Sequence, residues 1–261
     1  MERKPRPLTQ RQWRESVASM RKRADKGDVQ AMTDLGLTLI EGIQDRHGAA
    51  LIRRNSKAAA GWLRQAAARG DRVPAGSLGY AYDVGLGVAR RKDQAILWYR
   101  KAANWGNSGA ASNLATVYRD AGKPGLAFRW WNRAAEMSDG EAAVDVGYCY
   151  YYGIGTTRNA SAAYQFFRCA INSKGISQYG REEAMYHLAV ALMDSRQARS
   201  AIQLLRKANV DHDYPEAASL LDQLKTGNAC VPCRCRRLTN KTLRGHAACL
   251  LHPKLPRAAS S

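Results

Sequence analysis

The sequence predicts an all-α superhelical solenoid of about five helix pairs, and three observations support this fold class. A phrase of two large apolar residues, two polar ones and two small ones recurs, with copies starting at Trp62, Trp98, Trp130, Phe166 and Leu204. A second phrase, Leu-Gly or an equivalent pair, lies between the copies at intervals of 32 to 43 residues. The step from the first phrase to the next Gly or Ala position is 17 residues at four copies and 23 at one.

Each unit is expected to consist of two helices. In the best-formed unit, residues 76–82 and 93–105 have apolar side chains at helical spacing, and the Gly-rich segment 85–88 separates them. Large aromatic residues in one helix and small Gly or Ala residues in the other favour close helix packing. Unit length varies almost wholly in the stretch between the two helices, so successive units are expected to stack at the junction of nearly constant length.

Residues 70–106 resemble the Sel-one-like repeat, a relative of the tetratricopeptide repeat. The matching positions are Gly70, Ala75, Leu78, Gly79, Tyr82, Gly85, Gly87, Val88, Ala95, Trp98, Tyr99, Lys101, Ala102 and Ala103. Residues 138–171 follow the same pattern nearly as closely, and the resemblance covers 27–226. It implies a right-handed solenoid, and it explains the segments at 85–88 and 153–156 as turns between paired helices rather than phosphate-binding loops.

Three regions follow from this arrangement. Residues 1–26 form a basic N-terminal segment with a lone second helix at about 9–26 that caps the array. Residues 27–226 form the repeat array, which ends in a first helix from Glu216 to Lys225. Residues 227–261 form a small basic tail rich in Cys and His.

The positive charge is concentrated at both ends of the chain. The net charge is +19; residues 1–26 carry nine Lys or Arg against three acids, and residues 227–261 carry seven and no acid. Basic ends attract phosphates or acidic partners, so nucleic acid is a candidate partner; the alternative is a solvated tail without a dedicated ligand. The sequence has no apolar stretch long enough to span a membrane and no apolar leader, so we expect a cytoplasmic protein without a membrane partner.

The tail contains a candidate zinc site. Six potential ligands fall within 23 residues, and four of them would fill a tetrahedral site: Cys230, Cys233, Cys235, His246, Cys249 and His252. The favoured set is Cys230, Cys233, Cys249 and one histidine, with Cys235 as the main rival. The alternatives are a disordered tail with free thiols and regulatory disulfide chemistry. Such a zinc unit would be structural, with a basic contact surface of Arg234, Arg236, Arg237, Lys241 and Arg244.

The two remaining cysteines, Cys149 and Cys169, are expected to be small buried hydrophobic residues. Four tyrosines at 148 and 150–152 are expected to serve packing. One polar residue per unit precedes the Gly or Ala position by two, and this column is a candidate lining for a partner-binding groove, the alternative being an ordinary solvated face: Asp34, Ser77, Asn113, Asp145 and His187, with Ser219 in the last helix.

No catalytic motif accompanies the repeats. His187 has no neighbouring residue in the sequence that would complete a catalytic group. The sequence therefore predicts a non-enzymatic scaffold or adaptor that binds a protein partner and has no small-molecule substrate. A nucleic-acid-associated regulator that binds through the tail is the alternative, and a hydrolase ranks third.

Overall fold

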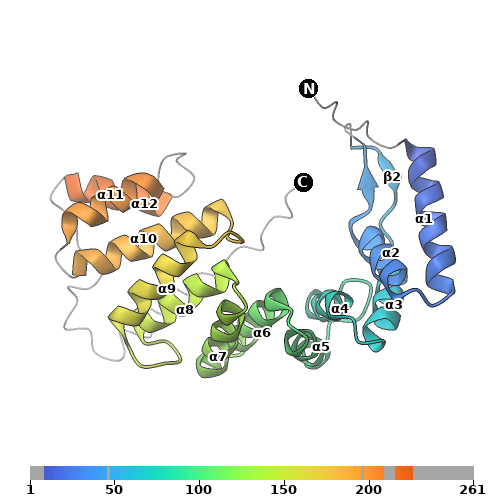
Figure 1. The fold of residues 1–261 in the computed structure, drawn as a ribbon, viewed down its shortest axis with the longest axis horizontal. Helices are drawn as coiled ribbons and strands as arrows, with labels where there is room; N and C mark the ends of the chain where they lie inside the picture. Colours follow the sequence, from blue (N-terminus) through green and yellow to red (C-terminus); the bar gives the residue numbers. More distant parts are fainter. Residues whose placement is uncertain (1–8, 46–47, 195–196, 209–214, 226–261) are drawn as a thin grey trace.

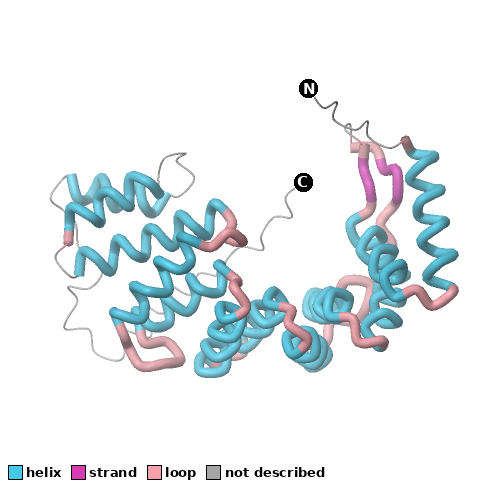
Figure 2. The backbone as a smooth tube through the Cα atoms, viewed as in Figure 1, coloured by secondary structure: helices cyan, strands magenta, loops and turns pink. Residues whose placement is uncertain are grey.

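The computed structural model describes residues 9–45, 48–194, 197–208 and 215–225. Within these ranges, twelve helices follow one another in packed pairs along an open arc, with one short β-hairpin near the start (Figure 1). The tube view shows that loops make up only a small part of the array (Figure 2). The chain is an α solenoid, as the sequence predicts. No helix in the described ranges is long and apolar enough to cross a membrane.

Six helices are first helices of a unit and six are second helices. The first helices are α2 (Val29–Glu41), α4 (Arg72–Val84), α6 (Ser108–Asp120), α8 (Gly140–Tyr152), α10 (Gln178–Asp194) and α12 (Pro215–Lys225). The second helices are α1 (Gln10–Asp25), α3 (Ser56–Ala68), α5 (Lys92–Asn104), α7 (Pro124–Glu136), α9 (Ala160–Asn172) and α11 (Ala198–Ala208). Helix α1 lies where a lone second helix is expected, and α12 where the last first helix is expected.

At three of the four 17-residue steps, a three-residue turn joins the second helix to the next first helix, before α4, α6 and α8, and the same turn joins α1 to α2. The middle residue of this turn has positive φ: Gly27 (92°), Gly70 (89°), Gly106 (87°) and Ser138 (66°). The third residue caps the next helix by accepting a backbone N–H bond with its side chain: Asp28, Asp71, Asn107 and Asp139. Before α10 the linker has five residues, two more than the turn before α8. In addition, Ala189 lies eleven residues after the start of α10, whereas Gly147 lies seven residues after the start of α8. These additions account for the 23-residue step.

Ser138 is the one non-glycine residue at positive φ in the described part of the chain. We expect Ser138→Gly to raise the free energy of unfolding by about 0.5–1 kcal/mol, because a side chain in this conformation carries strain that glycine avoids. Urea unfolding monitored by circular dichroism measures the change. The reciprocal variant Gly106→Ser should be destabilised by a similar amount; an unchanged or lowered stability of Ser138→Gly would contradict the account.

The closest helix contacts lie within a unit, across the loop of variable length. A Cβ added to Gly79 in α4 would lie 2.6 Å from the ring of Tyr99 in α5, and one on Gly147 in α8 would lie 2.6 Å from the ring of Phe167 in α9. Both rings are buried. The predicted match of small to large residues is thus confirmed. Successive units also pack against each other across the junction of nearly constant length, as predicted. These two glycine–ring contacts, however, lie within the units.

The loops inside the units reach back to the preceding second helix. Gly85 ends α4 in the left-handed conformation, and Gly87 places its backbone against Ser56 at the start of α3. Gly155 does the same at Pro124, the first residue of α7. The loop between α2 and α3 departs from the predicted all-α fold, since it contains an antiparallel hairpin of β1 (Ile43–Gln44) and β2 (Ala50–Ile52), and β2 packs against α1.

Candidate functional site: two faces of the repeat array

The predicted polar column lies on the solvent-facing side of the first helices. Asp34, Ser77, Asn113 and Asp145 are each the sixth residue of their helix, and His187 holds the same repeat position in α10. Asn113 is exposed and the other four are half-buried. Helices α4 and α6 lie on the inner side of the arc, while α5 and α7 lie on the outer side (Figure 1). The repeat therefore places one column residue per unit on a common face, called the inner face below.

On α4 the inner face is apolar. Val73, Tyr80 and Val84 are 43%, 48% and 50% exposed, and with Ser77 they follow the helical spacing of one face. These are among the most exposed large apolar residues of the described chain. These three residues were not among the binding residues predicted from the sequence. The signal was present, since these residues lie four before, three after and seven after Ser77.

At the C-terminal end of the inner face, His187 belongs to an aromatic cluster. Its ring stacks on Phe167 at 5.5 Å between ring centroids and meets Tyr148 edge-on at 5.3 Å. Burial raises the pKa of Tyr148 to about 12, so its hydroxyl stays neutral at physiological pH. Tyr150 packs against Phe128 and Phe166, as the packing interpretation of the tyrosines predicts. These contacts give His187 a packing role on the inner face.

The first helices are acidic. Together they contain eleven Asp or Glu residues and only four Lys or Arg residues, and α2 and α8 contain no basic residue. Three of the acids occupy the predicted column or the same helix face: Asp34, Glu141 and Asp145. An inner face of this composition favours a partner segment with basic side chains.

The second helices have the opposite charge. They contain sixteen Lys or Arg residues and only four acids. The mild positive charge of the array therefore hides two sets of helices with opposite net charge. Sequence reasoning did not find this, although the Arg or Lys residues in the middle of the repeated phrase gave the signal. The exposed side of the second helices is called the outer face below.

The two described cysteines differ from each other. Cys149 is buried, as predicted, whereas Cys169 is exposed on α9, so the expectation of burial was wrong for Cys169. The physical reason is its repeat position: Cys169 replaces Lys101 of the second unit, and that position faces solvent. Burial, with a smaller effect from Asp145, raises the pKa of the Cys149 thiol to about 12.

We expect N-ethylmaleimide at pH 8 to modify Cys169 within minutes and to leave Cys149 unmodified until the chain is unfolded. The reason is that the thiolate is the reacting species, and burial suppresses both its formation and its access. Mass spectrometry of tryptic peptides assigns each modification separately from the tail cysteines. The variant Cys169→Ser serves as the control. Modification of Cys149 in the folded chain at the rate of Cys169 would contradict the burial.

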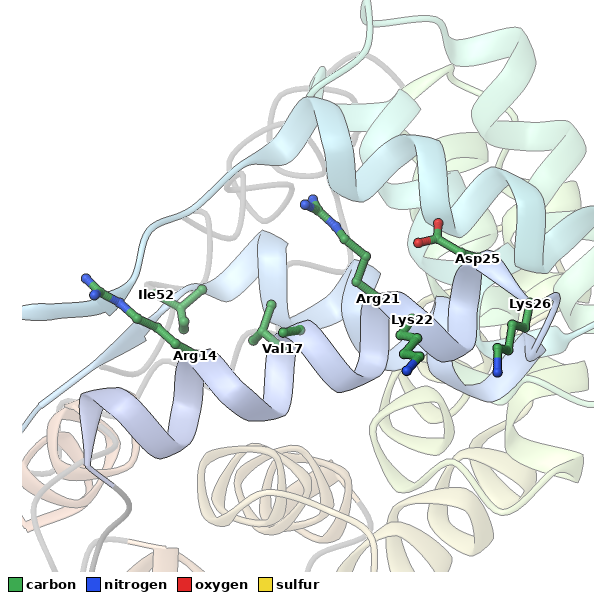
Figure 3. Close-up of a pocket in the computed structure, with 8 residues that line it drawn as sticks. Arg14, Val17, Arg21, Lys22, Asp25, Lys26 and Ile52 are labelled. Atoms are coloured by element: carbon green, nitrogen blue, oxygen red, sulfur yellow. The ribbon is translucent and has the colours of Figure 1, made fainter.

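A depression of about 590 Å³ lies on α1 beside β2. Its lining contains three apolar residues, four cations and one acid: Arg14, Val17, Ala18, Arg21, Lys22, Asp25, Lys26 and Ile52. Figure 3 shows Val17 between Arg14 and Arg21, with Ile52 beside Arg14. Both Arg21 and Lys22 belong to residues 19–24, a degraded copy of the repeated phrase that starts 17 residues before Gly36. The depression thus marks the N-terminal end of the outer face.

The predicted metal ligands and the basic contact residues of the tail lie outside the described residues, so zinc binding stays a prediction. Within the described ranges, no group of three or more Cys, His, Asp or Glu side chains is placed to hold a metal ion. The inner and outer faces of the array are therefore the sites that the geometry supports.

Comparison with known proteins agrees with this geometry. The Sel1 repeat family matches residues 29–71, 77–107, 110–139, 140–174 and 182–209. The structure of c5321, a protective antigen of uropathogenic Escherichia coli with an SLR fold, has a TM-score of 0.72 at 24% identity; the match covers 82% of this chain and 44% of c5321.

This chain thus spans less than half the length of c5321. A Sel1 repeat protein from Oxalobacter formigenes has a TM-score of 0.65 at 22% identity, over 80% of this chain and 90% of that one. No curated protein matches. Since the family matches cover most of the array, unit by unit, this chain belongs to the Sel1 repeat family.

Proposed function

We propose that the chain is a non-catalytic adaptor that binds a segment of a partner protein along its inner face. Repeat folds of the Sel1 and tetratricopeptide type typically mediate protein–protein interaction, and they are generally scaffolds rather than catalysts. The observation that carries the proposal is the exposed apolar strip of Val73, Tyr80 and Val84 on α4. Large apolar side chains exposed together mark interaction sites more often than isolated ones do.

The chemistry of the inner face defines the partner segment. Its apolar side chains pack on the strip of α4, while its basic side chains meet the acids of α2 and α8, where Asp34 and Asp145 lie. Aromatic and apolar anchors supply most of the affinity, and the surrounding charges set orientation and association rate. Tyr80 is the expected anchor.

Paired variants test this function. In Tyr80→Ser/Val84→Ser the apolar strip is lost; in the matched control Leu97→Ser/Leu126→Ser, two other exposed apolar residues, both on second helices, are replaced. We expect the first variant to reduce capture of specific partners from a lysate at least ~10-fold, because loss of an anchor costs about 2 kcal/mol, and the control to retain capture. Quantitative mass spectrometry measures both. Equal capture by the two variants, with unchanged thermal unfolding, would exclude the inner face.

A further inference from the structure

We propose that the outer face of the second helices binds single-stranded nucleic acid. This is a second binding surface, independent of the inner face and of the tail. It consists of two adjacent rows of cations at the third and fourth positions of the repeated phrase. The third-position row is Arg21, Arg64, Arg100, Arg168 and Arg206; the fourth-position row is Lys22, Lys101, Arg133 and Lys207.

The rows are regular because equivalent residues make equivalent contacts. The Arg64 guanidinium donates to the Tyr82 hydroxyl at 3.2 Å, and Arg100 donates to Tyr118 at 3.2 Å, each 18 residues further along the chain. These bonds hold two third-position arginines in the same orientation in successive units. The row cations named in α3, α5, α9 and α11 are exposed, and Arg133 of α7 is half-buried.

The row cations are not neutralised by neighbouring acids. The ion pairs of the described chain join other residues, and among the four acids of the second helices Glu15 pairs with Arg11 and Asp93 with Arg91. Helices α3, α9 and α11 contain no acid. A line of unpaired cations, one or two per unit, attracts a polyanion by release of its counterions.

Aromatic rings accompany the cations. The Lys101 ammonium lies 4.5 Å from the Trp98 ring centroid, and the Arg133 guanidinium lies 5.2 Å from that of Trp130. Trp105 at the end of α5 is 40% exposed, and Tyr164 on α9 is exposed beside Arg168. Cations that follow the phosphates, together with rings on which bases stack, are the two components of sequence-tolerant single-strand binding.

The N-terminal end of the rows has the highest density of cations. There Arg14 and Lys26 join Arg21 and Lys22 around the depression on α1, with Val17 and Ile52 as its apolar lining (Figure 3). A strand that follows the rows therefore ends at a concave site that has apolar residues, four cations and the single acid Asp25 in its lining. This end is where the strand gains its closest contacts.

The curvature of the array selects a single strand over other polyanions. The second helices α5 and α7 lie on the outer, convex side of the arc (Figure 1). A DNA duplex has a persistence length of about 50 nm and so touches only part of a convex surface. A flat acidic membrane likewise meets only the few units at the apex. A flexible single strand follows all the units, so it alone uses both rows in full.

The test compares full-length variants with equal loss of charge. The row variant is Lys22→Gln, Lys101→Gln, Arg133→Gln and Lys207→Gln, which spares the arginines bonded to tyrosine. The matched control replaces four exposed cations that lie outside the second helices: Arg53→Gln, Arg72→Gln, Lys123→Gln and Lys174→Gln. The tail variant is Arg234→Gln, Arg236→Gln, Arg237→Gln and Arg244→Gln. Fluorescence anisotropy measures binding to a labelled single-stranded RNA of about 30 nucleotides, which is long enough to contact several units.

We expect the row variant to weaken RNA binding at least ~30-fold at about 0.1 M salt, and to reduce the slope of log K against log salt by about three, because four phosphate contacts are lost. The control should lose less than ~3-fold, and circular dichroism should show equal folding. Duplex DNA should bind more weakly than RNA. Equal binding by row variant and control, or loss only in the tail variant, would overturn the proposal. So would binding to vesicles of phosphatidylserine and phosphatidylcholine without binding to RNA.

Discussion

Replacing Gly87 with alanine is expected to lower the free energy of unfolding by about 3 kcal/mol, combining backbone strain and a steric clash. Gly87 has a φ of 70°, a conformation that costs an alanine about 1–2 kcal/mol. In addition, the new Cβ would overlap the backbone carbonyl of Ser56 at the start of α3. Backbone atoms of a capped helix cannot move aside as a flexible side chain can. Urea unfolding followed by circular dichroism measures the loss.

Gly122→Ala is the matched control for this prediction. Gly122 has a similar φ of 68°, but an added Cβ would meet nothing within 4 Å. It should therefore lose only the conformational part, about 1–2 kcal/mol. If the two variants lose equal stability, the contact between the loop and α3 contributes nothing, and the packing described for Gly87 is wrong.

Gly79→Ala is the second variant with a large expected effect, a loss of about 2 kcal/mol. Alanine is intrinsically favoured over glycine inside a helix by about 1 kcal/mol. Here the added Cβ would lie 2.6 Å from the buried Tyr99 ring, so the helices α4 and α5 must separate or the ring must leave its position. The overpacking outweighs the helical preference. Urea unfolding again measures the change.

Two further variants make this prediction specific. Gly61→Ala in α3 has open space around the new Cβ and should gain about 0.5–1 kcal/mol, the opposite sign. In the double variant Gly79→Ala/Tyr99→Leu, the smaller side chain makes room for the new methyl group, so the loss should be smaller than the sum of the two single losses. A gain in stability for Gly79→Ala alone would contradict the close contact.

The sequence predicted the architecture well because the repeat controls it. The glycine of the Leu-Gly phrase is small since Tyr99 or Phe167 fills the space beside it, and the 17-residue step recurs before α4, α6 and α8 since the same three-residue turn with positive φ joins the helices there. Each of these constraints recurs in several units, so the sequence repeats it. The hairpin of β1 and β2 occurs once, and a single feature gives no internal comparison from which to predict it.

The candidate faces were predicted only in part. The column through Asp34 and Asn113 was identified by its position before the repeated Gly or Ala, and its role in binding stays a prediction. The exposed strip on α4 and the difference in charge between first and second helices were not predicted. The helical spacing around Ser77 and the Arg or Lys residues of the repeated phrase indicate them, but the total net charge does not. Cys169 was likewise predicted to be buried from its residue type alone, whereas its exposure follows from its place on α9.

The loops that reach back to a preceding helix have a mechanical consequence for the array. Contacts from β2 to α1, from Gly87 to α3 and from Gly155 to α7 join neighbouring units, whereas a Cβ added to Gly122, in the short turn between α6 and α7, would meet nothing within 4 Å. The boundary between α5 and α6 is held by helix packing and by the hydrogen bond from Arg100 to the Tyr118 hydroxyl. Under tension along the arc, this boundary is where we expect the solenoid to bend first and to separate into two cooperatively folded blocks.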